Sequence, residues 1–465
     1  MGTLLFVLSL LGSRIPPQSP QVPLALRNVT VIDAARGLAL PNMTVVIDGD
    51  HIAQAGRSDA VSLPAGARIV DAAGKFVIPG LWDMHVHTIF GDWFPSGREI
   101  ALPLFIANGV TGVRDMGGEL DVLLQWRKEK EIVQGNIPGP RLVVSGEMLD
   151  GPEPRFPSSI AVSNPGDGRR AVRDLKRRGA DFIKLQSLIP RETVLAIADE
   201  AKNLGIPVAG HVPDAVRAAE ASNAGLKSFE HLIGIFEGSS TLEDEFLEGG
   251  KRPGRFLESF DAARAAKLFA LLAKNETWQC PTLVWERGGS LIEERDLGRD
   301  PLAKYAPVSW KTGTWKKFTD LIVHEFNVDD LATRKRFVEK ELELVSEMHR
   351  AGVPFLAGTD TAAGVYVFPG FSLHQELDLF VRAGFTPAEA LATATSNPAR
   401  FLGMEDRLGA VETGKLGDLV LLDRNPLDDI RNTREIFAVV ANGRYFSRED
   451  LDRLLLQVEE RAATH

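Results

Sequence analysis

The chain has 465 residues, too many for one small domain and more than the roughly 250 residues of a (β/α)8 barrel alone. Hydrophobic residues make up 44% and charged residues 25%, which is typical of a globular protein with a sizeable core and excludes a largely disordered chain. The formal net charge of -10 argues against a nucleic-acid partner, because nucleic-acid binding requires a basic surface.

The N-terminus begins with an apolar run over residues 1–12 (MGTLLFVLSLLG). This run is too short for a membrane-spanning helix, which needs about 20 residues, but it matches the apolar region of a secretory signal. No Lys or Arg precedes it and no clear cleavage site follows, so the alternatives are a disordered leader or a start placed too early. We predict that residues 1–23 form a leader for export to the periplasm or outside the cell. If the leader is not a signal, we expect a cytoplasmic protein.

The two ends of the chain carry similar β-type patterns. Residues 25–32, 44–47 and 52–56 are rich in β-branched side chains, and Asp48-Gly49 is a natural hairpin turn between the last two runs. Comparable runs return at residues 417–423 and 436–443. We therefore predict one β-sandwich domain formed by residues 24–77 and 406–450, followed by a C-terminal helix over residues 451–465.

The central region, residues 78–405, alternates short apolar strands with helical stretches. Several helices end in a glycine just before the next strand, as at Gly205 and Gly352, which is a C-cap signal. Eight β-then-α units predict an α/β fold with parallel strands closed into a (β/α)8 TIM barrel. The predicted strands are residues 80–87, 112–115, 142–146, 182–185, 208–211, 228–231, 279–284 and 354–359.

The interval over residues 285–344, between the seventh and eighth strands, is long and helical, with Trp310 and Trp315 in it. Because segments that follow barrel strands lie over the active face, we interpret it as a cap over the pocket. A surface helical pair without contact to substrate is the alternative. The strand before it carries Cys280, the only cysteine, which excludes an intrachain disulfide and which we interpret as a buried core thiol.

Polar side chains recur at the predicted C-terminal ends of the barrel strands, and these ends converge on one face. In chain order they are His85 and His87, Lys184, His211, His231 and Asp360. Alternate residues of a strand point to the same side, so both histidines of the His-x-His pair can face the barrel axis. Imidazole and carboxylate groups are the usual ligands of a catalytic zinc, and a bound divalent metal lowers the pKa of water to about 7. The pattern therefore predicts hydrolysis of an amide or an ester.

Lys184 differs from the other members because an ammonium group is costly to bury. Burial lowers a lysine pKa and yields a neutral amine, which can add carbon dioxide to become an anionic carbamate able to bridge two metals. A lysine paired with an acid at the barrel mouth is the alternative, and the spacing leaves both open. We assign the remaining histidines without such a context to the surface or the core; they are His51, His324, His349 and His465.

Four stretches, residues 77–87, 179–184, 357–360 and 389–420, resemble the amidohydrolase superfamily, specifically its imidazolonepropionase-like and prolidase-like branch. The resemblance implies a distorted barrel with a β-sandwich from both chain ends and a site for two metals, with Zn²⁺ expected and other divalent ions left open. By that resemblance, His85, His87 and Asp360 would hold one metal and His211 and His231 the other. Carboxylated Lys184 and a hydroxide would bridge them, and Asp360 would carry the proton from water to the leaving group.

The resemblance favours hydrolysis of an amide (C–N) bond in a small peptide-like or N-acyl amino acid substrate, for example an Xaa-Pro dipeptide. Cyclic-amide or lactone hydrolysis, or deamination with one metal and no lysine bridge, is the second hypothesis. We expect a small-molecule partner, no nucleic acid and no integral membrane segment in the mature chain, and we leave a homo-oligomer open. Candidate substrate contacts are Arg114, Glu147, Arg155, Tyr366 and residues 285–344, while His374 could touch substrate or stabilise a helix start.

Overall fold

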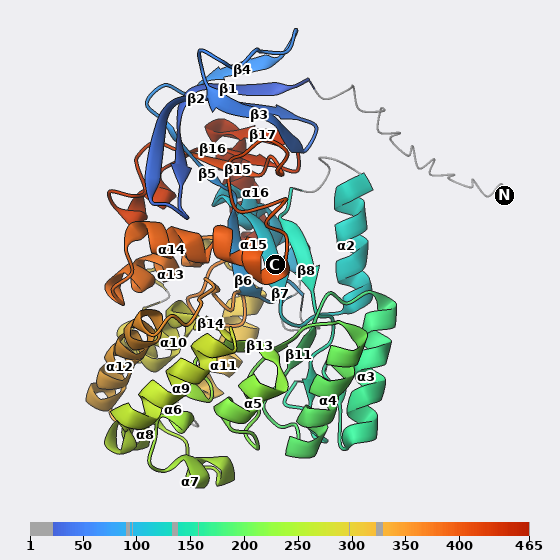
Figure 1. Cartoon of the computed structure of the whole chain (residues 1–465), viewed down its shortest axis with the longest axis vertical. Coiled ribbons are helices and arrows are strands. Elements are labelled where there is room, and N and C mark those ends of the chain that lie inside the picture. Colours follow the sequence, from blue (N-terminus) through green and yellow to red (C-terminus); the bar gives the residue numbers. More distant parts are fainter. Residues whose placement is uncertain are drawn as a thin grey trace, which may run out of the picture.

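The computed structural model describes residues 22–89, 94, 96–132, 138–156, 158–296, 298–321 and 329–464. The predicted leader, apart from its last residues, lies outside these ranges, as do His324 and His465. A β-sheet formed by the first and last segments of the chain sits at one end of a larger body of strands and helices (Figure 1).

The sheet at this end contains eight strands in the order β17-β16-β15-β5-β1-β2-β3, with β4 paired to β1. The two chain ends meet where β5 pairs antiparallel with β15, for example at Ile78 and Val420. The prediction that both ends build one β-domain is thus confirmed. Its strands are β1 (Leu24–Asp33), β2 (Leu38–Asp48), β3 (His51–Arg57), β4 (Arg68–Asp71), β5 (Phe76–Pro79), β15 (Leu419–Leu422), β16 (Ile436–Ala441) and β17 (Arg444–Ser447).

The core of this domain follows from the period-2 alternation of its strands. Leu24 and Leu26 of β1 point to the same side and are buried, and Val45 and Ile47 of β2 pack against them in the same cluster. The β-branched residues recognised in the sequence therefore form the inner face of the sheet.

The larger body is the barrel, with parallel strands that pair in chain order except that β9 pairs with β11 and β10 lies at the edge beside β9. β6, β7 and β8 form one sheet, and β9 to β14 form a second. The Asp181 amide donates to the Val144 carbonyl at 2.8 Å and connects the two sheets. The strands are β6 (Leu81–Val86), β7 (Val110–Asp115), β8 (Arg141–Val144), β9 (Leu149–Asp150), β10 (Ile160–Ala161), β11 (Ile183–Leu185), β12 (Val208–Gly210), β13 (Leu226–Glu230) and β14 (Trp278–Cys280).

The eighth predicted strand is irregular. Residues 354–361 make only single parallel bridges, Phe355 to Gln279 and Thr361 to Val86, but they lie between β14 and β6 and close the barrel. The Asp83 carboxylate of β6 accepts hydrogen bonds from the Thr359 amide at 3.0 Å and its hydroxyl at 2.7 Å across this closure. Gly358 permits the close approach, because a Cβ there would lie 2.4 Å from the Cys280 sulfur.

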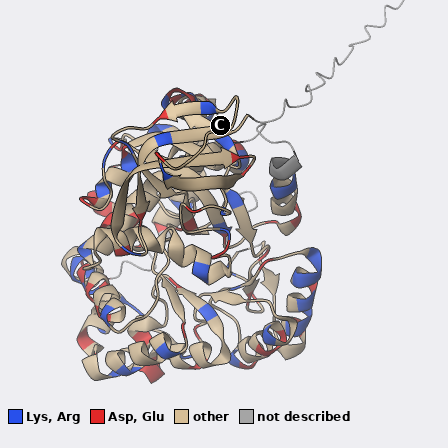
Figure 2. Ribbon diagram, turned by 45° about the horizontal axis from the view of Figure 1, so that its top comes forward, with Lys and Arg blue, Asp and Glu red and all other residues tan. Residues whose placement is uncertain are grey.

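The helices cover the outside of the barrel, and Figure 2 shows most charged residues on them while the strands inside are largely uncharged. As predicted, Gly205 ends its helix in the left-handed conformation, with φ of 64°. The helices are α1 (Gly97–Ala107), α2 (Leu120–Ile132), α3 (Pro165–Arg178), α4 (Arg191–Leu204), α5 (Ala218–Ala224), α6 (Ile235–Gly238), α7 (Glu243–Glu248), α8 (Pro253–Ser259), α9 (Ala262–Lys274), α10 (Leu283–Ser290), α11 (Trp315–Leu321), α12 (Leu331–Arg350), α13 (Phe371–Arg382), α14 (Pro387–Thr393), α15 (Ser396–Leu402) and α16 (Arg448–Thr464).

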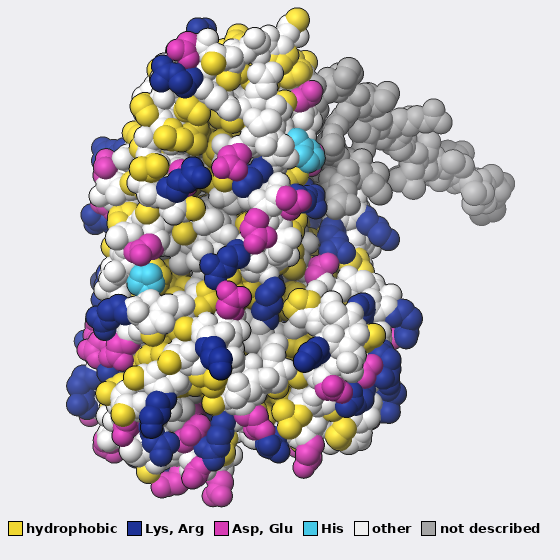
Figure 3. Space-filling view, viewed as in Figure 1, with side chains coloured by type: hydrophobic (Ala, Val, Ile, Leu, Met, Phe, Trp, Pro, Cys, Tyr) yellow, Lys and Arg dark blue, Asp and Glu magenta, His cyan; other side chains and the backbone are white. Residues whose placement is uncertain are grey.

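The C-terminal helix α16 begins at Arg448, slightly before the predicted residue 451, and packs against α1. On the face seen in Figure 3, basic and acidic side chains are interspersed with apolar ones. Within the described residues, no helix is both long enough and apolar enough to cross a membrane.

Candidate active site

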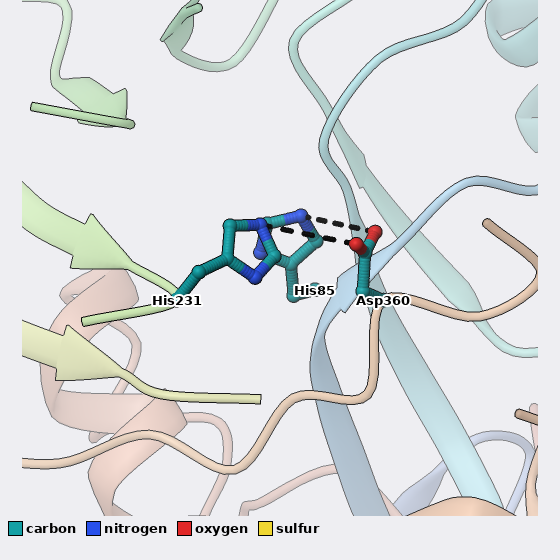
Figure 4. A group of neighbouring side chains, drawn as sticks. All are labelled: His85, His231 and Asp360. Atoms are coloured by element: carbon teal, nitrogen blue, oxygen red, sulfur yellow. Dashed lines mark ion pairs between the residues drawn. The ribbon is translucent and has the colours of Figure 1, made fainter. Parts of the chain in front are cut away.

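Three of the predicted site residues meet at the point where the barrel closes. His85 lies near the end of β6, and His87 follows the strand. Their Nε2 atoms lie 3.4 Å and 3.2 Å from the Oδ1 atom of Asp360. Asp360 has a left-handed backbone conformation, with φ of 57°, and its amide donates to the His85 carbonyl at 2.8 Å. His231 approaches the other carboxylate oxygen at 3.8 Å, and Figure 4 shows His85 and His231 both directed toward Asp360.

Each of the four histidines has a hydrogen-bond partner for its Nδ1 atom. The partners are Glu230 Oε2 for His85 (2.8 Å), Gly117 O for His87 (3.1 Å), Ser187 Oγ for His211 (2.9 Å) and Thr282 Oγ1 for His231 (2.6 Å). A carbonyl only accepts, so the His87 ring carries a proton on Nδ1. Metal-ligating histidines are oriented in this way, with one nitrogen fixed by the protein and the other left for the ion. Burial lowers the pKa of His87, but the hydrogen bond and the charge of the Asp360 carboxylate outweigh that effect and raise it above its usual range.

Glu230 was missed by the sequence reasoning, although it directly precedes His231. It is fully buried, and besides His85 it binds the Arg114 guanidinium at 2.9 Å and the Ser228 hydroxyl at 2.6 Å. Neighbouring strand residues point to opposite sides. The sequence position of Glu230 beside His231 therefore gave no indication that Glu230 supports His85.

The prediction of Arg114 as a substrate contact was wrong. Arg114 lies on β7, is fully buried, and donates to the Met84 carbonyl at 2.5 Å and to Ser228 at 2.9 Å as well as to Glu230. A charged residue in the middle of a barrel strand can point into the barrel interior, beneath the site, and there it needs a buried acid as its partner.

Lys184 lies on β11 with 1% of its surface exposed, and its Nζ atom has no hydrogen-bond partner among the described residues. Burial lowers the pKa of its amine to about 8. The described part of the chain gives Lys184 no ion pair with an acid, so the alternative of a lysine paired at the barrel mouth is not what the structure has.

The residues at this site fit a divalent metal. Buried atoms that lack a hydrogen-bond partner in the described chain include His85 Nε2, Lys184 Nζ and Asp360 Oδ1, which all belong to the predicted ligand set. Ligand atoms of His85, His231 and Asp360 lie within 4.8 Å of one another. Nitrogen and carboxylate oxygen are donors that zinc prefers.

A second grouping of His85 with Glu230 and Cys280 does not fit a metal equally well. Burial raises the pKa of the Cys280 thiol well above its usual range, so the sulfur stays protonated, and Glu230 is already bound to Arg114. Cys280 is a buried core thiol, as predicted.

The protonation states suit metal binding. Burial lowers the pKa of His231 to about 4 and holds the pKa values of His85 and His211 well below the usual range, so these imidazoles are neutral. Burial alone would raise the pKa of Asp360, but the neighbouring imidazoles outweigh that effect and hold it well below its usual range. Neutral imidazoles and an ionised carboxylate are the forms that bind metals.

A cavity of about 320 Å³ opens above this group. All six predicted site residues line it: His85, His87, Lys184, His211, His231 and Asp360. Residues 285–344 also line it through Trp285, Phe318 and Phe337, so this segment forms part of the pocket wall, as the cap interpretation predicted.

The other candidate substrate contacts divide into two groups. Arg155 lines the cavity, whereas Glu147 is paired with Arg178 at 2.9 Å and is not part of the lining. Tyr366 is buried in an apolar cluster with the Arg295 guanidinium over its ring. His374 is buried between Thr433 and Asn108, with hydrogen bonds of 2.9 Å and 3.1 Å, and so has the structural role.

The sequence profile of the amidohydrolase family matches residues 76–445, which include the barrel and all six site residues. The chain belongs to the amidohydrolase family. The resemblance inferred from the sequence motifs is thereby confirmed, as are the barrel and the β-domain formed from both chain ends. The protein is an amidohydrolase, an enzyme that acts on carbon–nitrogen bonds, and it has a candidate His/Asp metal site.

Among its relatives is the ochratoxinase of Aspergillus niger, 27% identical over 422 residues that cover 78% of this chain and 73% of the relative. A Bifidobacterium longum protein assigned as a prolidase is 27% identical, with a TM-score of 0.67, over 95% of this chain and 100% of that chain. The bottromycin amidohydrolase structure is 25% identical, with a TM-score of 0.73, over 95% of this chain and 90% of that chain.

Proposed function

We propose that this amidohydrolase cleaves the amide bond of a small peptide-like or N-acyl amino acid substrate and that it works with two divalent metals, preferably Zn²⁺. The observation that carries the proposal is the convergence of six predicted ligands on one cavity, with buried donor atoms that the protein itself leaves without hydrogen bonds. The names of its relatives, a prolidase and a bottromycin amidohydrolase, support an amide substrate.

The donor set suggests how the metals would be divided. His85, His87 and Asp360 would hold one ion, and His211 and His231 the other. Lys184 would link the two as a carbamate, formed when the neutral Nζ amine bonds to the carbon of carbon dioxide and releases one proton. The lowered pKa of Lys184 supports this step, because only the unprotonated amine has the electron pair that the new bond needs.

The chemistry that such ions supply when bound is a lowered pKa of water and polarisation of a carbonyl. The chain's own contribution is proton transfer by Asp360, whose carboxylate is ionised and lies beside three imidazoles. Asp360 accepts a proton from the attacking water and delivers it to the nitrogen of the leaving amine. Trp285, Phe318 and Phe337 supply apolar surface to the wall of the same cavity.

Metal quantification combined with native mass spectrometry tests the proposal. We expect two metal ions per chain and an added mass of one carbon dioxide that disappears in the Lys184→Ala variant. A zinc-loaded enzyme should then hydrolyse members of a panel of Xaa-Pro dipeptides and N-acyl amino acids. One metal per chain with unmodified Lys184 would favour the deaminase or cyclic-amide alternative, and inactivity on the whole panel would contradict the amide proposal.

A further inference from the structure

Two acidic side chains that are not among the proposed metal ligands, Glu286 and Glu341, also line the cavity. Glu286 lies on α10, which begins directly after Thr282, the residue that holds the His231 ring. The Glu286 amide donates to the Thr282 carbonyl at 3.2 Å, so the two residues are one helical turn apart.

These carboxyl groups have no basic partner within the described residues. Glu341 is 2% exposed and lies on α12, which packs against α10. Within the part of the chain that the structure describes, one side-chain hydrogen bond reaches the Glu286 carboxyl group, from the Ser290 hydroxyl at 3.4 Å. A third acid, Glu376, lies close by and accepts hydrogen bonds from the first amides of α10, Leu283 at 3.0 Å and Val284 at 2.8 Å. Burial raises the pKa of Glu286 to about 7 and that of Glu341 well above its usual range.

Most basic side chains on this side of the cavity are bound elsewhere. Lys251 pairs with Asp214 at 2.7 Å and with Glu237 at 3.2 Å. Arg334 pairs with Glu293 at 2.6 Å, and Arg252, which also lines the cavity, is 3.9 Å from Asp329. Within the described residues no lysine or arginine, including Arg155 of the cavity lining, forms an ion pair with Glu286 or Glu341. The raised pKa values mean that protons neutralise the two acids when no cation is bound, and a bound cation would favour their ionised form.

The surroundings of the two acids are aromatic. Trp285 directly precedes Glu286, and Phe337 lies one helical turn before Glu341 on α12. Both rings line the same cavity, together with Phe318. Aromatic faces attract cations, and carboxylates form strong charge-assisted hydrogen bonds to ammonium and guanidinium groups. Unpaired buried acids within such a wall cost folding free energy, which a cationic ligand would offset.

We propose that Glu286 and Glu341 form a subsite for a cationic group of the substrate, a primary ammonium or a guanidinium. The preferred substrates are then amides that carry a lysine-like or arginine-like side chain, with the scissile bond at the strand ends and the cation between α10 and α12. That the cleaved bond is an amide rests on the proposed function. The cation subsite rests instead on Glu286, Glu341 and the aromatic side chains around them.

A matched pair of substrates tests the subsite kinetically. Nα-acetyl-lysine and Nα-acetyl-norleucine have similar chains and differ in the terminal ammonium, as do the dipeptides Lys-Pro and norleucyl-proline. With zinc-loaded enzyme we expect kcat/KM to favour the lysine member of at least one pair by about tenfold or more. Glu341→Gln and Glu286→Gln should reduce this preference to about twofold or less, because a neutral amide loses the charge but keeps the shape.

The control variant is Glu339→Gln, on the same helix but with a side chain that is 58% exposed. It should keep the full preference for lysine. Thermal unfolding should show that both Gln variants are folded, since an acid without a basic partner is not needed for stability. If neither variant folds, the wild-type comparison of lysine with norleucine still decides the question.

Calorimetric binding of Nα-acetyl-lysine amide and Nα-acetyl-norleucine amide separates this inference from the proposed function. Hydrolysis of both members of every pair at equal rates would overturn the subsite and leave the amide hydrolase intact. Absence of any hydrolysis, together with lysine-selective binding that Glu341→Gln abolishes, would leave the subsite standing and contradict the amide proposal. Equal binding of both ligands would overturn the subsite.

Discussion

The cavity has two regions: a floor, formed by the six predicted site residues at the strand ends, and a wall, formed by helices α10 and α12. The two regions differ in how their polar side chains are held in place. On the floor, at the strand ends, polar side chains are fixed by further polar groups, as in the chain from His85 through Glu230 to Arg114. On the wall, helices α10 and α12 present aromatic rings together with Glu286 and Glu341, for which the described residues supply no basic partner. The floor is therefore suited to hold atoms in fixed positions for a reaction, and the wall is suited to select which molecule reaches them.

The largest expected effect is on the floor. Asp360→Asn should lower kcat/KM by about 100- to 10,000-fold, because general acid–base catalysis contributes that much and the amide can neither accept the proton nor bind a metal as a carboxylate does. Steady-state kinetics of the zinc-loaded variant, with circular dichroism to show that it is folded, provides the measurement. Wild-type kcat/KM in the Asp360→Asn enzyme would contradict the catalytic role of Asp360, and with it the assignment of the reaction to the floor.

The next effect tests the support beneath the floor. Glu230→Gln should weaken metal affinity by about 10- to 100-fold, as loss of a group that orients a ligand histidine typically does. Competition with a chelator of known affinity measures it. Asp418→Asn serves as the control, because Asp418 pairs with Arg141 at 2.5 Å at the junction with the β-domain; it should lower stability but leave metal affinity unchanged. Equal loss of affinity in both variants would show a general effect of folding.

A wall residue should affect recognition instead. Phe337 stacks near Phe236, with ring centroids 4.5 Å apart, and lines the cavity. We expect Phe337→Leu to raise KM by about three- to tenfold with kcat nearly unchanged, because the ring contributes binding that does not change between ground state and transition state. Phe446→Leu, a buried ring of β17, should destabilise the protein without this change in KM. A fall in kcat with unchanged KM would instead show that Phe337 contributes to the chemical step, as the floor residues do.

The smallest expected effect concerns pH. Burial raises the pKa of Glu376 from 4.5 to about 8, so the folded protein holds a proton that the unfolded chain releases between these values. The contribution of this group to stability should then be greatest below pH 4.5, decline as pH rises toward 8, and level off above that value. Glu376→Gln removes the titrating group, together with one of the two hydrogen bonds from the α10 amides, and should flatten this decline, measured by urea unfolding at several pH values. An unchanged slope would show that Glu376 is ionised in the folded protein.

The floor could be predicted from sequence because its residues follow from local pattern. A short apolar strand that ends in a polar residue places that residue at the barrel mouth, and this rule located His85, His211 and Asp360. Arg114 and Glu230 could not be assigned in the same way, since which strand residues point inward beneath the site depends on how the barrel closes. The predicted eighth strand, residues 354–359, lies between β14 and β6 as the barrel requires, but no local pattern shows the close approach of Gly358 to Cys280 and His85.

The wall was harder to predict for a different reason. Glu286 and Glu341 lie 55 positions apart on two helices, and only the packing of α10 against α12 brings them to one cavity. The sequence indicated that residues 285–344 lie over the pocket, but helical periodicity alone leaves open which side of each helix faces inward. Tertiary packing decides that orientation.

The closure of the barrel by residues 354–361 has a consequence for how the enzyme is assembled. The Thr359–Asp83 hydrogen bond joins positions 276 residues apart, so it forms only after nearly the whole barrel is in place. His85 and Asp360 stand on opposite sides of that closure. Metal ions bound to both would fasten the first strand to the last, and mass action would then favour the closed barrel over any partly opened one. We therefore expect metal uptake to follow barrel closure and to stabilise the closed fold.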